Sequence, residues 1–117
     1  MDLRELLQAV LTHDMLTARQ WVTDAIRAGF RWEAVGQPEG LDPVSLALAA
    51  SLVELMAERT GRRCPSWTAA VPAAPERLFL VEAARVLPRL RRLCEEEGPE
   101  PLRRRRFLAP PDFLTAA

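Results

Sequence analysis

The sequence lacks Lys entirely, and this absence excludes two kinds of chemistry. All 16 residues that carry a fixed positive charge are Arg, and Asn and Tyr are missing as well. Without a Lys amine, the chain cannot form a Schiff base with a carbonyl substrate or supply the Lys of a phosphate-binding P-loop. With only five Gly, it also offers no glycine-rich phosphate loop.

Cysteine and histidine are scarce, which weighs against a metal centre and against nucleophilic catalysis. The chain has two Cys, Cys64 and Cys94, and one His, His13. The two Cys lie 30 residues apart and neither belongs to a Cys-x-x-Cys pair, so they predict neither a disulfide scaffold nor a zinc site. Cys64 precedes a proline and Cys94 lies on an apolar helical face, so we expect inert thiols. We therefore expect no metal, no cofactor, no catalytic residue and no enzymatic activity.

Long uninterrupted hydrophobic runs are absent too. No stretch reaches the ~18 apolar residues that a membrane-spanning helix needs. The N-terminal residues carry charges early and lack the apolar run of a secretory signal. We therefore expect no membrane association, a reducing cytoplasm as the setting, and two free thiols.

The apolar residues that are present, 49% of the chain, indicate one globular domain organised around a central helix. Asp42 and Pro43 are a typical cap and first residue of a helix, and Gly61 can take the left-handed conformation that ends one. Between them, apolar residues cover more than one face. We therefore expect a helix over residues 43–60 that is surrounded by others, with Val53 almost fully buried.

The remaining segments predict an all-α fold, a compact bundle of four to five helices with an irregular, proline-rich second half. Apolar residues recur at helical spacing on both sides of a short break near His13, which predicts an antiparallel helical hairpin. Three prolines after the central helix block long regular structure there, and Trp67 should anchor that segment. The predicted parts are the hairpin (2–29), the central helix (43–60), the proline-rich segment (62–76), a last helix (88–97) and a docked tail (99–117). Residues 78–81 are either a short extended piece or the first turn of a helix.

Charge is balanced overall but unevenly distributed along the chain. Residues 1–58 carry four Arg and nine acids, a balance of −5, whereas residues 59–117 carry twelve Arg and seven acids, a balance of +5. The two halves can pack against each other with electrostatic fields of opposite sign, or the second half can offer a basic surface to an anionic partner. We favour complementary packing, because pairing within the domain needs no partner.

One run of like charges stands out, formed by Arg103, Arg104, Arg105 and Arg106. Four successive guanidinium groups can grip phosphates or a partner's carboxylates. The sequence pI of about 6.6 and the zero net charge weigh against nucleic acid. Of three roles for the run, we favour arginines that are solvated or paired inside the domain. Binding to a protein partner ranks second, and binding to nucleic acid ranks third. If the run is extended, alternate arginines should act together.

Three stretches of the sequence resemble a group of small bacterial proteins, similar to the C-terminal part of antitoxin-like helix-turn-helix regulators. They are Leu55–Gly61 at the end of the central helix, Pro65–Trp67 after it, and Pro110–Leu114 after the arginine run. The likeness covers roughly residues 42–114. It implies an antitoxin-like or adaptor role and supplies no catalytic residues.

These observations favour a non-enzymatic, cytoplasmic protein-interaction module, in its specific form the antitoxin-like partner of a toxin. The alternative is a small nucleic-acid-associated regulator that uses the arginine run, and an enzyme of unknown type ranks third. The candidate partner-binding residues are Arg103, Arg104, Arg105, Arg106 and Trp67, the last as an interface residue if it is exposed.

Overall fold

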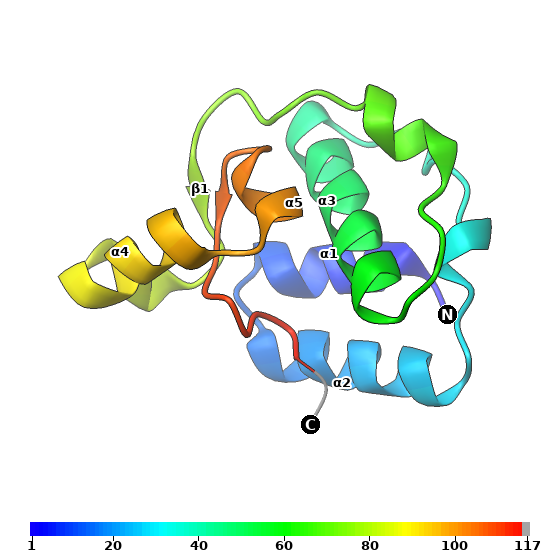
Figure 1. Ribbon diagram of the computed structural model, residues 1–117, viewed down its shortest axis with the longest axis horizontal. Helices are drawn as coiled ribbons and strands as arrows, with labels where there is room; N and C mark the ends of the chain where they lie inside the picture. Colours follow the sequence, from blue (N-terminus) through cyan, green and yellow to red (C-terminus); the bar gives the residue numbers. More distant parts are fainter. Residues whose placement is uncertain (116–117) are drawn as a thin grey trace.

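A computed structural model shows five α-helices and one pair of very short strands in the part of the chain that it describes (Figure 1). The structure describes residues 1–115. Most of this part of the chain is helical, and the helices enclose one main hydrophobic core. The predicted all-α bundle is therefore confirmed. None of the helices in the described part of the chain combines the length and the hydropathy needed to cross a bilayer.

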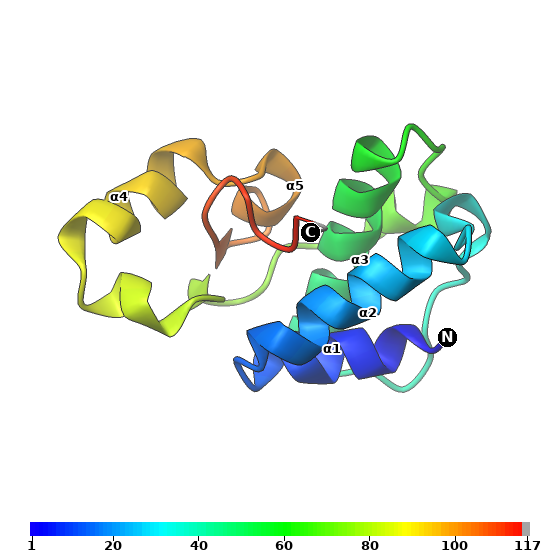
Figure 2. The same ribbon diagram turned by 90° about the horizontal axis from the view of Figure 1, so that it is seen from below.

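The N-terminal hairpin consists of α1 (Leu3–Leu11) and α2 (Met15–Arg27), which lie side by side and run in opposite directions (Figures 1 and 2). Each helix begins after an Asp, Asp2 or Asp14, whose carboxylate accepts a backbone N–H from the first turn. His13 takes a positive φ of 60° at the reversal between the helices. The short connection thus produces the antiparallel pair that the sequence predicts.

The central helix α3 (Pro43–Arg59) ends one residue earlier than predicted. Asp42 caps it by accepting the Ser45 N–H at 3.2 Å. Every residue from Ala47 to Ala57 is buried, and Val53 is fully inaccessible to solvent. A helix this apolar on all sides needs neighbours around it, which α1, α5 and two short 3-10 turns supply.

The loop before α3 contributes an aromatic side chain to the core. A 3-10 turn, η1 (Trp32–Ala34), places Trp32 in the core at 1% exposure. The Trp32 ring lies 4.7 Å from the Phe30 ring and 6.0 Å from the Trp21 ring, centroid to centroid. These tilted and edge-on pairs are the arrangements that aromatic rings prefer. The aromatic cluster thus closes one end of the helical hairpin.

Besides the short helix α5 (Glu100–Arg103), the less regular path after α3 contains four short elements and one longer helix. They are η2 (Ser66–Ala70), β1 (Leu78–Phe79), η3 (Glu82–Arg85), α4 (Pro88–Glu97) and, further on, β2 (Phe107–Leu108). β1 and β2 pair in parallel, with Leu78 opposite Phe107. The chain over residues 78–79 is therefore extended, which settles the alternative that the sequence left open.

The prediction that α4 is the last helix is wrong. A further helix, α5 (Glu100–Arg103), follows it inside the segment that the sequence described only as a docked tail. Pro99 and Pro101 suit the start of such a short helix. Beyond β2, Arg59 of the central helix donates to the backbone oxygens of Pro111 and Phe113, which holds the end of the described chain against the body.

The segment formed by η3 and α4 extends away from the bundle, at the left end of the molecule in both views (Figures 1 and 2). It has its own small cluster of buried residues, Ala84, Cys94 and Leu108, with Phe79 and Leu90 packed against it. We call residues 85–92, which join η3 to the first half of α4, the tip. The tip therefore projects from a minor core, while the main core lies under α3.

Candidate functional site

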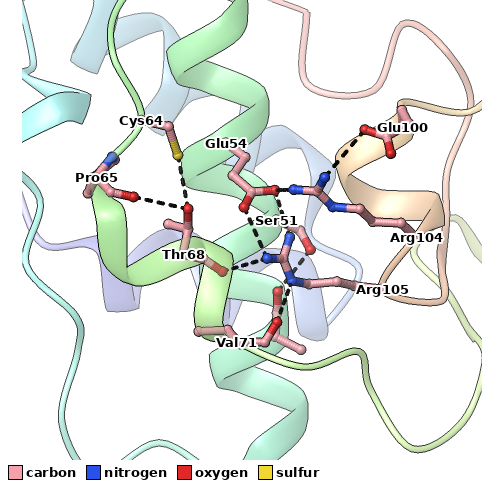
Figure 3. A network of polar contacts seen from close by, with 10 residues as sticks. Ser51, Glu54, Cys64, Pro65, Thr68, Val71, Glu100, Arg104 and Arg105 are labelled. Carbon is pink, nitrogen blue, oxygen red and sulfur yellow. Dashed lines mark hydrogen bonds and ion pairs between the residues drawn. The ribbon is translucent and has the colours of Figure 1, made fainter.

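A buried ion pair joins the central helix to the arginine run. Glu54 of α3 is 9% exposed and Arg105 is 4% exposed. The Arg105 Nη1 lies 2.7 Å from Glu54 Oε1, and its Nη2 lies 3.0 Å from Oε2, so the pair is bidentate (Figure 3). A buried carboxylate without a partner costs several kcal/mol. Glu54 therefore depends on Arg105 to compensate its buried charge.

The same guanidinium also binds the proline-rich segment. Arg105 Nη2 donates to the Thr68 carbonyl at 2.6 Å, and Nε donates to the Val71 carbonyl at 3.2 Å (Figure 3). One side chain thus connects α3, the segment around η2 and the C-terminal segment. Because Arg105 is buried and uses donors on all three of its nitrogens, it has an internal structural role.

Arg104 shares the Glu54 carboxylate, pairing with its Oε1, and lies 3.8 Å from Glu100 Oε2 (Figure 3). About half of the Arg104 side chain, 48%, stays exposed. Burial by itself raises the pKa of the Glu54 carboxyl, but hydrogen bonding to Arg105, Thr68 and Arg104, together with the charge of Arg105, outweighs burial and holds the pKa below its ordinary value. Glu54 is therefore charged at neutral pH and neutralises one of its two arginines.

The outer arginines of the run bind backbone oxygens. Arg103 Nη1 lies 3.2 Å from the Glu96 carbonyl, and Arg106 Nη1 lies 2.6 Å from the Pro75 carbonyl. The run is not extended, because Arg103 ends α5 and the next residues turn, so the condition under which alternate arginines were expected to act together is not met. The neighbours Arg104 and Arg105 share one carboxylate instead. All four arginines thus have internal acceptors, although Arg103, Arg104 and Arg106 remain on the surface.

Trp67 is half-buried and packs against the main core. Its Nε1 donates to the Val35 carbonyl at 2.8 Å, which ties η2 to the loop before α3. No hydrogen bond or ion pair within residues 1–115 joins Trp67 to the arginine run, although Thr68 beside it accepts from Arg105. Trp67 therefore anchors its segment as expected and leaves part of its ring at the surface.

The thiols and the imidazole are held in separate environments. Cys94 is fully buried, and this burial raises the pKa of its thiol. Cys64 is exposed, with its Sγ 3.0 Å from Thr68 Oγ1, and both cysteines are free. His13 Nδ1 lies 3.3 Å from the Leu80 carbonyl. Across the described residues, no three side chains of the metal-binding types come together.

The tip carries a surface that the sequence interpretation did not identify. Val86 is 76% exposed and its neighbour Leu87 is 51% exposed. Beside them lies a hollow of about 400 Å³, lined by Arg85, Val86, Pro88, Arg91, Arg92 and Glu95. Two apolar side chains and several arginines thus share one projecting surface.

The arginines of the tip differ in how they are held. Arg91 is fixed, because its Nε lies 3.3 Å from the Ala84 carbonyl and its guanidinium lies 5.4 Å from the Phe79 ring centroid. Arg85, Arg89 and Arg92 make no side-chain hydrogen bond or ion pair with any described residue. The tip therefore offers three positive groups that the fold itself does not use.

Comparison with protein-family models, with curated proteins and with solved structures gives no match to this chain. The function is therefore inferred from the residues and their geometry. Two regions carry candidate groups: the arginine run around Glu54, and the tip at the start of α4.

Proposed function

We propose that the protein is a non-enzymatic, cytoplasmic protein-interaction module. The observation that carries this proposal is the exposed pair Val86 and Leu87 on the projecting tip, bordered by arginines that have no internal partner. Apolar side chains flanked by arginine are typical of protein–protein contacts, in which arginine is enriched. The two free cysteines fit a reducing compartment.

The arginine run supports a structural role more than a binding role. Arg105 is buried against Glu54, and the other three arginines each donate to an acceptor within the protein. A nucleic acid that used the run would have to compete with these contacts. We therefore rank the nucleic-acid-associated regulator below the protein-interaction module.

The specific form that we propose is an antitoxin-like partner of a toxin, which rests on the sequence resemblance. Two of the three resembling stretches touch, because Arg59 at the end of α3 donates to the carbonyl oxygens of Pro111 and Phe113. The shared stretches thus belong to the scaffold of the domain. In this proposal the tip, which lies between them in the sequence, contacts the partner.

The test is co-expression of the tagged protein with the product of an adjacent gene, followed by size-exclusion chromatography with light scattering. We expect a stable complex that is weakened by the double change Val86→Ser and Leu87→Ser. The matched control is Leu16→Ser, since Leu16 is 82% exposed and lies on α2, outside the tip. Failure to form any such complex, together with salt-dependent retention of DNA or RNA in a gel-shift titration, would overturn the proposal.

A further inference from the structure

The charges of α4 are arranged against the dipole of the helix. Arg89, Arg91 and Arg92 lie in its first half, and residues 95–97 are three consecutive Glu in its last turn. A helix N-terminus carries partial positive charge and favours anions, whereas the C-terminus favours cations. Glu95 is paired with Arg77, but the arrangement as a whole disfavours the isolated helix. A local preference broken in this way is expected at functional surfaces.

The N-terminus of α4 also lacks the cap that the other long helices have. Asp2, Asp14 and Asp42 cap α1, α2 and α3 with their carboxylates. At the equivalent position α4 has Leu87, with extended backbone (φ −101°, ψ 105°) and no side-chain hydrogen bond to the helix. This backbone is compatible with a capping Asp or Ser, which would stabilise the helix. The chain instead places an exposed apolar side chain there.

The basic groups around Leu87 are available to a partner. Arg85 and Arg92 line the hollow and make no side-chain hydrogen bond or ion pair in the described part of the chain, while Arg91 is oriented by Phe79 and the η3 carbonyls. Carboxylates form their strongest hydrogen bonds with arginine, often through two parallel N–H groups. Arg85 and Arg92 have no carboxylate partner among the described residues and can therefore bind the carboxylates of another protein.

We propose that the tip, residues 85–92, docks an acidic segment of a partner protein, whose carboxylates pair with Arg85 and Arg92 and whose apolar side chain packs on Val86 and Leu87. This inference rests on the proposed protein-interaction function and names the chemistry of the partner. The charge complementarity carries it: the partner supplies the negative charge that the start of α4 lacks. The exposed apolar pair becomes buried in the complex.

A protein segment fits the tip better than a phosphate polymer or an anionic membrane. Glu95 lines the same hollow as Arg85 and Arg92, and Glu96 and Glu97 follow it on α4. These carboxylates repel a phosphate backbone or an anionic bilayer, which present negative charge everywhere. A folded or extended peptide can place its carboxylates at the arginines alone. Mixed charge of this kind favours specificity for one partner.

The first experiment titrates the full, ¹⁵N-labelled chain with a synthetic peptide in which Leu alternates with pairs of Glu. We expect chemical-shift changes centred on the backbone amides of residues 85–92, and an affinity that falls as salt is raised. Three further probes are a peptide with Arg in place of every Glu, a short DNA duplex, and vesicles rich in phosphatidylglycerol. They should leave these amides unchanged.

Two variants separate the contacts of the tip from its folding. The double change Arg85→Gln and Arg92→Gln should weaken peptide binding at least about tenfold, because both charge-assisted bonds are lost. Leu87→Asp should weaken it similarly while raising the melting temperature, since Asp caps α4. Leu16→Asp and Arg19→Gln on α2 are the matched controls and should bind as the wild type does. A variant that is more stable but binds less cannot be explained by unfolding.

The inference is overturned if the acidic peptide leaves the tip amides unshifted up to its solubility limit. It is also overturned if the Arg-containing peptide, the duplex or the vesicles shift these amides equally. The third contradicting result is light scattering that shows self-association through the tip. If a partner complex forms but tolerates both tip variants, this inference fails; the protein-interaction role stands, but its contact surface lies outside the tip. If only nucleic acid binds, the proposed function fails as well.

Discussion

Arg105 binds both carboxylate oxygens of Glu54, at 2.7 and 3.0 Å, although 51 residues separate the two in the sequence. The pair lies under η2 and joins the acidic first half of the chain to the basic second half. The expectation that the two halves pair with each other is thus met by this buried contact, beside the more exposed pairs of Arg104 with Glu54 and Arg62 with Glu33. Arg105, which belongs to a run that resembles a binding motif in the sequence, therefore stabilises the fold.

Replacing Arg105 should therefore destabilise the protein severely. Arg105→Met leaves a buried carboxylate with only the half-exposed Arg104 as its partner, which should lower the free energy of unfolding by about 3–5 kcal/mol. Arg104→Gln is the matched control and should cost about 1 kcal/mol or less, because exposed ion pairs contribute little. Urea denaturation measures both. Equal, small losses for the two variants would contradict the central role of Arg105.

Acid should weaken the fold through the same carboxylate. The pKa of Glu54 is lower in the folded protein than in the unfolded chain, so its stabilising contribution is present above the ordinary pKa of 4.5 and is lost as pH falls through the folded pKa. The unfolded state binds more protons in that window, and stability therefore rises with pH. Thermal melts between pH 7 and pH 3 should fall more steeply for the wild type than for Glu54→Gln. Parallel curves would show that Glu54 is not the titrating group.

Trp67 and Trp32 should differ in their contribution to stability. Trp32 is 1% exposed in the core, so Trp32→Ala should cost about 3–5 kcal/mol. Trp67 is half-buried with one hydrogen bond to Val35, so Trp67→Ala should cost about 2 kcal/mol. Guanidinium denaturation followed by circular dichroism compares the two. If Trp67→Ala has no effect, the residue is not an anchor and its surface is free for a partner.

Gly98, between α4 and α5, is required because two backbone oxygens approach it closely. A Cβ at this position would lie 2.5 Å from the Ala109 carbonyl oxygen and 2.6 Å from that of Cys94. Gly98→Ala should therefore destabilise the protein by about 1–3 kcal/mol through forced backbone shifts. Gly36 has no atom within 4 Å of a Cβ, so Gly36→Ala serves as the control and should be neutral or slightly stabilising. Equal melting temperatures for both variants would contradict the packing of the C-terminal segment.

Leu87→Asp should stabilise the isolated protein. The new carboxylate can accept N–H groups of the first turn of α4, as Asp42 does for α3, and this is worth about 1 kcal/mol. The measurement is a thermal melt beside that of Leu16→Asp, which adds the same charge near the start of α2. A drop in melting temperature for Leu87→Asp would show that the Leu87 side chain stabilises the fold itself.

The helices could be predicted from the sequence because their signals are local. Asp2 and Asp42 stand before apolar periodic runs, and the helix boundaries follow from such caps within a residue or two. The short helix α5 (Glu100–Arg103) was missed because its four residues are too few to show a period. Its place depends on contacts with α3, which no local pattern encodes.

The sequence shows the arginine run but does not determine its role. A run of like charges gives no sign of which member is buried, since that depends on a carboxylate far away in the chain. Glu54 is the one charged residue within the buried stretch Ala47–Ala57, and it is the signal in the sequence that an arginine is buried beside it. In the sequence, nothing distinguishes Val86 and Leu87 from other apolar residues. Their exposure results from the way in which η3 and α4 extend from the bundle.

The most direct test compares two double variants, each measured for its melting temperature and for its affinity for the partner protein. We expect Arg85→Gln with Arg92→Gln to weaken the complex and to leave the melting temperature unchanged. We expect Arg104→Gln with Arg106→Gln to lower the melting temperature by several degrees and to leave the affinity unchanged. The reverse pattern, in which the arginine run determines the affinity and the tip determines the stability, would show that the arginine run, and not the tip, binds the partner.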